Sequence, residues 1–140
     1  MICDAAAGFQ EWTIDLVLDR NPGQIDTTLV FCLKFNADRT ISGKVFRSGS
    51  TVPLSDVTGR NQPFSQVNTD PPPTLMSLEF KIDGLNLTMS GAKLDTLFEG
   101  RFRAFGGASM AAAAPSKSWD GAVAFAPSDG DTGTATGSQT

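Results

Sequence analysis

Hydrophobic and polar residues alternate with a period of two over most of the chain. In the segment 97–105 the alternate residues Phe98, Gly100, Phe102 and Ala104 share one face, as they would in a half-buried β-strand. We find similar strand patterns along the rest of the sequence, separated by short turn signals. The chain therefore predicts eight strands, at 11–19, 27–35, 40–47, 52–61, on either side of Asp83-Gly84, at 96–105 and at 118–126.

The strongest turn signal is Asp83-Gly84, which stands between two alternating runs. This dipeptide is typical of a two-residue β-hairpin turn, and such a turn fixes which residues lie opposite each other. We expect Ile82 to face Leu85 and Phe80 to face Leu87.

The second predicted strand has two unequal faces. Its inner face carries Leu29, Phe31, Leu33 and Phe35, and its other face mixes apolar with polar residues at Thr28, Val30, Cys32 and Lys34. A mixed outer face indicates that another part of the chain covers some of it.

Eight short strands with one apolar face and no long helix predict an all-β fold. The favoured architecture is an eight-stranded antiparallel up-and-down barrel, because closure removes exposed strand edges. The alternative is a two-sheet β-sandwich with a solid core. We expect a flexible amino-terminal tail at 1–10, one barrel domain at 11–127 and a disordered acidic tail at 128–140.

Three of the predicted strands carry a glycine in the middle of the apolar face: Gly43, Gly100 and Gly121. A glycine within a strand marks a bend, a bulge or a close approach of another group. An eight-stranded barrel is either just filled by its side chains or encloses one small ligand. The three glycines favour a cavity.

The strand order, Trp12 in the first strand, Gly43 in the third, and Pro53-Leu54 followed by Thr58-Gly59-Arg60 resemble the avidin and streptavidin family of the calycin superfamily. The resemblance covers about residues 10 to 105. It implies a calycin-like barrel with a ligand at its open end. The chain has no tyrosine, and the tryptophan-bearing strands of the family's biotin pocket do not match, so biotin binding is not implied.

The charge distribution limits the partners. The 15 acidic and 11 basic residues give a formal charge of -4 and no basic stripe, which argues against nucleic acid. No run of 18 apolar residues is present, so we expect no membrane span. The chain has no histidine and only two cysteines far apart, which argues against a metal site, and no motif indicates a cofactor.

Cys3 and Cys32 can pair only if the amino-terminal tail folds back onto the second strand. Free buried thiols are the favoured interpretation, because Cys32 lies within an apolar run. The residues Met1 to Gly8 lack the basic region and apolar run of a signal peptide, which predicts a cytoplasmic location, or secretion if a signal has been removed.

The sequence contains no catalytic motif, and the candidate site is a set of apolar side chains. The predicted ligand-binding residues, which would line the barrel interior, are Trp12, Phe31, Phe35, Phe80, Met89, Phe98, Phe102, Trp119 and Phe125. Glu99 and Arg101 are weak catalytic candidates, because they flank Gly100 on one face of a strand. The same two residues also fit a solvated outer face, which is the favoured interpretation.

Three hypotheses follow. The first is binding of a small apolar ligand inside the barrel, with specificity from the loops 62–73 and 106–116. The second is a cofactor-free cyclase or isomerase that folds an apolar, unsaturated substrate in the same space. The third is a homo-oligomeric interaction protein whose outer residues Val17, Val30, Phe46 and Leu97 pack against other copies.

Overall fold

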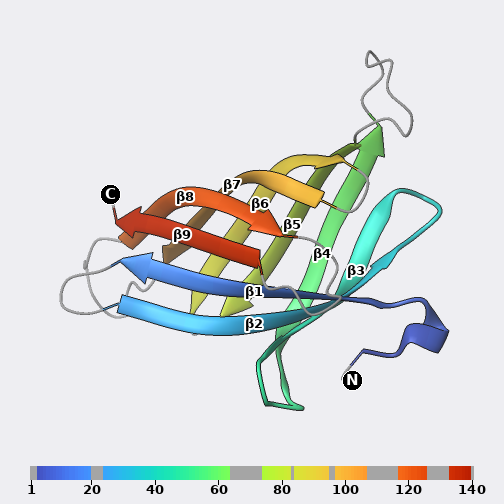
Figure 1. Ribbon diagram of the computed structural model, residues 1–140, viewed down its shortest axis with the longest axis horizontal. Helices are drawn as coiled ribbons and strands as arrows, with labels where there is room; N and C mark the ends of the chain where they lie inside the picture. Colours follow the sequence, from blue (N-terminus) through green and yellow to red (C-terminus); the bar gives the residue numbers. More distant parts are fainter. Residues whose placement is uncertain are drawn as a thin grey trace.

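A computed structural model describes residues 3–19, 24–63, 74–82, 84–94, 97–106, 117–125 and 133–139, and it forms a closed β-barrel over these residues (Figure 1). The only helix among them is a single 3₁₀ turn, η1 (Ala5–Ala7). The strands are β1 (Gln10–Asp19), β2 (Gln24–Phe35), β3 (Thr40–Arg47), β4 (Pro53–Pro63), β5 (Thr74–Ile82), β6 (Leu85–Leu94), β7 (Leu97–Gly106), β8 (Lys117–Phe125) and β9 (Gly133–Gln139). No helix in the described ranges is long and apolar enough to cross a membrane.

The all-β barrel predicted from the sequence is confirmed, and the two-sheet sandwich is wrong. The described part of the chain has nine strands rather than eight, and each pairs with the next in antiparallel fashion. β9 then pairs with β1 in parallel and closes the barrel. The parallel seam follows from the odd number, because in an up-and-down order the first and ninth strands run in the same direction.

The ninth strand lies in the segment that was predicted to be a disordered tail. That prediction is wrong for 133–139, and the remaining residues of the predicted tail lie outside the described ranges. The long loop predicted at 62–73 begins later than expected, since β4 continues to Pro63, and most of the loops 62–73 and 106–116 also lies outside them.

The hairpin register predicted from Asp83-Gly84 is confirmed. Ile82 pairs with Leu85, and Phe80 pairs with Leu87. This register places the alternate apolar residues of β5 and β6 inside the barrel and the polar ones outside.

The barrel interior holds one continuous hydrophobic core contributed by all nine described strands. Phe31 and Phe80 meet edge to face in it, with ring centroids 5.0 Å apart. The ring centroids of Trp12 and the half-buried Phe35 lie 6.1 Å apart. Phe31 on β2 and Phe80 on β5 thus meet across the barrel, whereas Trp12 and Phe35 come from the adjacent strands β1 and β2.

The glycines on the inner face have a different role from the predicted one. A Cβ added to Gly43, Gly100 or Gly121 would collide with a backbone carbonyl of the adjacent strand, at Cys32, Ser90 and Thr136 respectively. The backbone of the adjacent strand therefore approaches these glycines too closely for any side chain to fit there. They shape the wall instead of opening a cavity.

Residues 3–9, which we call the N-terminal arm, fold back over the outer face of β2 and β3. A disulfide joins Cys3 to Cys32, so the favoured prediction of free thiols is wrong, and the arm is anchored where a flexible tail was expected. The Asp4 side chain caps η1 by accepting a hydrogen bond from the backbone N–H of Ala7, at 3.2 Å. The arm, the disulfide and Phe46 form a second small apolar cluster, with Phe9 packed against it.

Candidate functional site

The structure places most of the predicted ligand-binding residues in the packed core. Trp12, Phe31, Phe80, Met89, Phe98, Phe102 and Trp119 are each at most 4 % exposed. Phe35 is half-buried, with the Lys93 ammonium 5.6 Å from its ring centroid. The Phe125 side chain lies outside the described part of the structure, and its backbone pairs with Phe98.

Several side chains in the described part of the interior are completely buried. A side chain that lined an empty space large enough for water would show accessible area, and Trp12, Ile14, Leu16 and Phe98 show 0 %. A ligand in the middle of the barrel would have to displace these side chains. Interior ligand binding and the cyclase or isomerase alternative need the same space, and both stay predictions.

Glu99 and Arg101 lie on the outer face of β7, where both side chains are exposed. Arg101 borders a shallow pocket of about 280 Å³ together with Arg103 and Asp120. The Arg103 Nε lies 3.0 Å from the Asp120 Oδ1 in an exposed ion pair. This arrangement is that of a solvated strand face, and it holds neither candidate next to an apolar cavity.

Two acidic residues approach each other on the outer face of β1 and β2. A hydrogen bond to Asp26 raises the pKa of Asp15, and partial desolvation and repulsion from the Asp26 charge act in the same direction. Among the described residues, no group of three or more cysteine or acidic residues could hold a metal ion.

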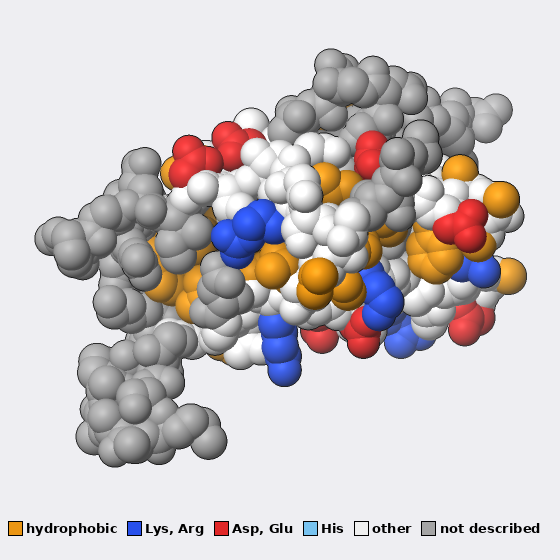
Figure 2. Space-filling model, turned by 90° about the horizontal axis from the view of Figure 1, so that it is seen from below, with side chains coloured by type: hydrophobic (Ala, Val, Ile, Leu, Met, Phe, Trp, Pro, Cys, Tyr) orange, Lys and Arg blue, Asp and Glu red, His pale blue; other side chains and the backbone are white. Residues whose placement is uncertain are grey.

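An apolar pocket of the described residues lies outside the barrel, between the N-terminal arm and β3. We call it the arm pocket. It has a volume of about 390 Å³, within the usual range for small-molecule sites. Figure 2 shows hydrophobic side chains at the surface at the right-hand end of the molecule, where Figure 1 places the arm. Its lining residues are Cys3, Asp4, Phe9, Cys32, Ser42, Gly43, Lys44 and Phe46.

The local sequence explains the walls of the arm pocket. Cys32 and Phe46 are apolar residues at outward positions of β2 and β3, and the disulfide brings the arm over them. Phe9 closes one side, with the Lys34 ammonium 5.9 Å from its ring centroid. Gly43, which has no side chain, lines the pocket with its backbone.

Two charged residues, Asp4 and Lys44, line the arm pocket. The Lys44 ammonium pairs with the Asp56 carboxylate at 2.5 Å, and both side chains are more than half exposed. The Lys44 charge is therefore largely compensated at the rim. The arrangement can hold an apolar body inside, with polar groups near the entrance.

The expected cover on the outer face of β2 was the sequence signal for this site. The mixed outer face of β2, where Cys32 stands between Val30 and Lys34, indicated a cover, and the arm covers Cys32. Phe46 was predicted to be a self-association residue, and the structure instead buries it beneath the arm at 8 % exposure. Phe9 carried no signal, because nothing in its local pattern links it to Cys32 and Phe46, 23 and 37 residues further along the chain.

No family model matches the chain, and no curated protein or solved structure matches it either. The resemblance to the avidin and streptavidin family therefore stays a prediction, and the geometry of the pockets carries the functional argument.

Proposed function

We propose that this protein binds a small apolar molecule in the arm pocket. The observation that supports this most is an apolar pocket of about 390 Å³ whose wall is held in place by the Cys3–Cys32 disulfide. Apolar lining with a few polar groups at the entrance is typical of small-ligand sites. A small apolar ligand is the class predicted from the sequence, but the proposed site lies outside the barrel and not in its interior.

The disulfide supports a ligand-binding role because it keeps the arm in place before the ligand arrives. An arm that had to become ordered on binding would lose part of the interaction free energy to conformational entropy. Phe9 and the sulfur atoms then present a preformed apolar surface.

Nuclear magnetic resonance with octanol and cyclohexanol as probes tests the proposal. We expect both probes to shift the backbone amide signals of Phe9, Ser42 and Lys44. Phe9→Ala should weaken binding by roughly five- to tenfold, because a ring that covers the ligand is lost. Val52→Ala is the matched control, since Val52 is 70 % exposed and does not line the pocket.

The two tryptophans distinguish this site from the interior. Trp12 and Trp119 lie in the core and do not line the arm pocket, so a saturated alcohol bound there should leave their fluorescence unchanged. Quenching of both, without amide shifts at the arm, would favour an interior ligand. The proposal is refuted if neither octanol nor cyclohexanol binds.

Loss of the disulfide gives an independent readout. Cys3→Ser should abolish probe binding while the β-sheet circular dichroism is kept, because the barrel does not depend on the arm for its closure. The free energy of unfolding should fall by about 2–4 kcal/mol, as expected for opening a loop of this kind. Probe affinity equal to that of the parent protein would contradict the assigned role of the arm.

A further inference from the structure

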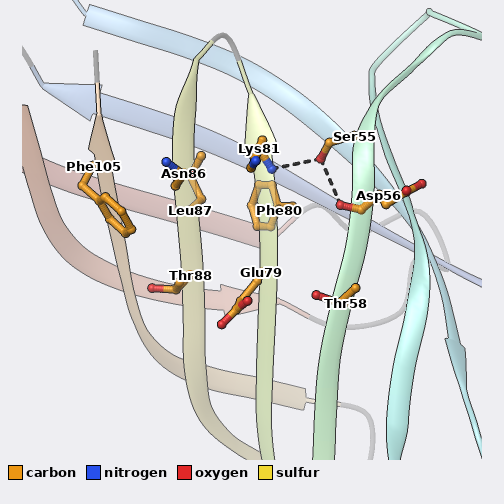
Figure 3. Close-up of a pocket in the computed structure, with 10 residues that line it drawn as sticks. All are labelled: Ser55, Asp56, Thr58, Glu79, Phe80, Lys81, Asn86, Leu87, Thr88 and Phe105. Atoms are coloured by element: carbon orange, nitrogen blue, oxygen red, sulfur yellow. Dashed lines mark hydrogen bonds between the residues drawn. The ribbon is translucent and has the colours of Figure 1, made fainter. Parts of the chain in front are cut away.

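A second pocket lies on the outer face of β4, β5, β6 and β7, and we call it the polar trough. It has a volume of about 590 Å³ (Figure 3). It shares no lining residue with the arm pocket. The residues on the outer side of the sheet that line it are Asp56, Thr58, Glu79, Lys81, Asn86, Thr88 and Phe105, and Ser55 and the core residues Phe80 and Leu87 also border it.

The strand register assembles the trough from adjacent rows. Thr58 pairs with Glu79, and Glu79 with Thr88, so three polar side chains cross β4 to β6 in one line. The next row runs from Lys81 through Asn86 to Phe105. Residues directly opposite on one face have Cβ atoms about 4.5–5.5 Å apart, so each row forms a continuous surface.

Some polar groups of the trough make hydrogen bonds within the fold, and others are available to a ligand. Ser55 is used by the fold, because its hydroxyl accepts a hydrogen bond from the Lys81 backbone N–H at 2.9 Å and donates to the Asp56 carbonyl at 3.0 Å. Among the described residues, the side chains of Thr58, Glu79, Asn86 and Thr88 make no hydrogen bond within the protein. They present hydroxyl, carboxylate and amide groups, both donors and acceptors, to the trough.

Phe105 is the one aromatic side chain that projects from this polar face, and it is 41 % exposed. Phe105 pairs with Asn86, so the two side chains lie on the same face, and Figure 3 shows the ring on β7, the strand next to the one that carries Asn86 and Thr88. The hydrophobic core does not use it. A flat apolar ring beside clustered hydroxyl and amide groups matches a ligand with one C–H face and many hydroxyls.

The charges of the trough favour a neutral ligand. Glu79 and Lys81 carry opposite charges on neighbouring positions of β5, and the Asp56 carboxylate is paired with Lys44. No surplus of positive charge is present to hold a phosphate or a carboxylate. We propose that the polar trough binds a neutral saccharide of one or two sugar units, which stacks on Phe105 and hydrogen-bonds to Glu79, Asn86 and Thr88.

Titration of the labelled full chain with maltose, cellobiose, lactose and diacetylchitobiose, followed by amide chemical shifts, tests the proposal. We expect at least one disaccharide to shift the signals of Lys81, Asn86, Thr88 and Phe105, with a Kd of roughly 1 mM. Phe105→Ala should weaken that binding about tenfold or more, and Phe105→Trp should retain it.

Leu97→Ala is the matched control, because Leu97 lies on the same strand, is 43 % exposed and does not line the trough. Its affinity should equal that of the parent protein, and dispersed amide signals should show that each variant is folded. The proposal is overturned if none of the four sugars shifts the trough signals, if the shifts map elsewhere, or if Phe105→Ala binds as tightly as the parent. These results do not depend on octanol binding at the arm pocket.

Discussion

Phe102 and Gly137 meet inside the barrel, and their contact shows how its interior is filled. A Cβ on Gly137 would lie 2.6 Å from the Phe102 Cζ and 3.3 Å from the Leu18 Cδ2. Phe102 is 2 % exposed and is surrounded by other core side chains. The ring thus occupies the space that a side chain at 137 would need, and large and small residues complement each other across the barrel.

Gly137→Ala should therefore destabilise the protein by about 1–3 kcal/mol through overpacking. Phe102→Leu shortens the side chain at the point of collision, so the double variant should lose less stability than the two single variants together. Urea unfolding of the four proteins measures this coupling. Thr134→Ala, an exposed position on the same strand, serves as the control, and strictly additive effects would contradict the contact.

Asp15 and Asp26 make stability depend on pH at the residue scale. Because the pKa of Asp15 is raised in the folded state, folded protein binds the proton more tightly than unfolded protein does. This contribution is fully present below the unfolded pKa and is lost as pH rises through the folded pKa. At neutral pH the two carboxylates repel each other.

Asp15→Asn should accordingly raise the free energy of unfolding at pH 7 by roughly 0.2–0.5 kcal/mol, as expected for an exposed charge pair. The gain should vanish in acid, where Asp15 of the parent is protonated. Chemical denaturation at several pH values measures the difference.

Asp38→Asn is a control of opposite sign. Hydrogen bonds from the Thr40 side chain and then from its backbone lower the pKa of Asp38, so this variant should lose stability at neutral pH and not in acid. The same pH trend in both variants would contradict the assignment of these interactions.

β9 shows at the element scale why part of the fold could not be predicted. Its residues are Gly133–Gln139, and its inner positions carry Gly133, Ala135 and Gly137, so it has no apolar alternation to recognise. Ala135 is nevertheless fully buried. The inward residues of β9 are small because side chains of other strands, such as Phe102, occupy the space beside them. This fit depends on the whole barrel and not on the local sequence.

Removal of residues 131–140 should leave β1 and β8 without a partner along one edge each. We expect this shortened chain to lose its folded monomeric form and to aggregate, because unpaired edges recruit other strands. Size-exclusion chromatography and circular dichroism measure the outcome. Thr136→Ser in the full chain is the control and should behave as the parent, and a soluble, folded truncated monomer would show that β9 is dispensable.

The elements that were predicted correctly carry their information locally. The register of β5 and β6 follows from Asp83-Gly84 and from alternation on both sides of it, and β3 was predicted with its observed bounds. The N-terminal arm carries no comparable signal. Its position depends on Cys3 reaching Cys32, a pairing across 29 residues that no local pattern determines.

At the scale of the whole molecule, closure determines where a ligand can be held. Adjacent strands approach closely at the inward glycines, and side chains from all nine described strands pack into one core. Trp12, Phe31, Phe80, Phe98, Phe102 and Trp119, which were predicted to line a ligand cavity, are buried in this core. Both proposed sites consequently lie outside the barrel, one made by the arm and one by the polar rows of β4 to β7.

The sequence by itself determined eight of the nine described strands, their inward and outward faces and the barrel class, because these follow from alternation and turn chemistry between near neighbours. Only the tertiary structure decided the ninth strand, the parallel seam, the disulfide and the state of the interior. Each of these depends on contacts between distant segments, and the same glycine pattern is compatible with an open or a filled barrel until the strands are placed around it.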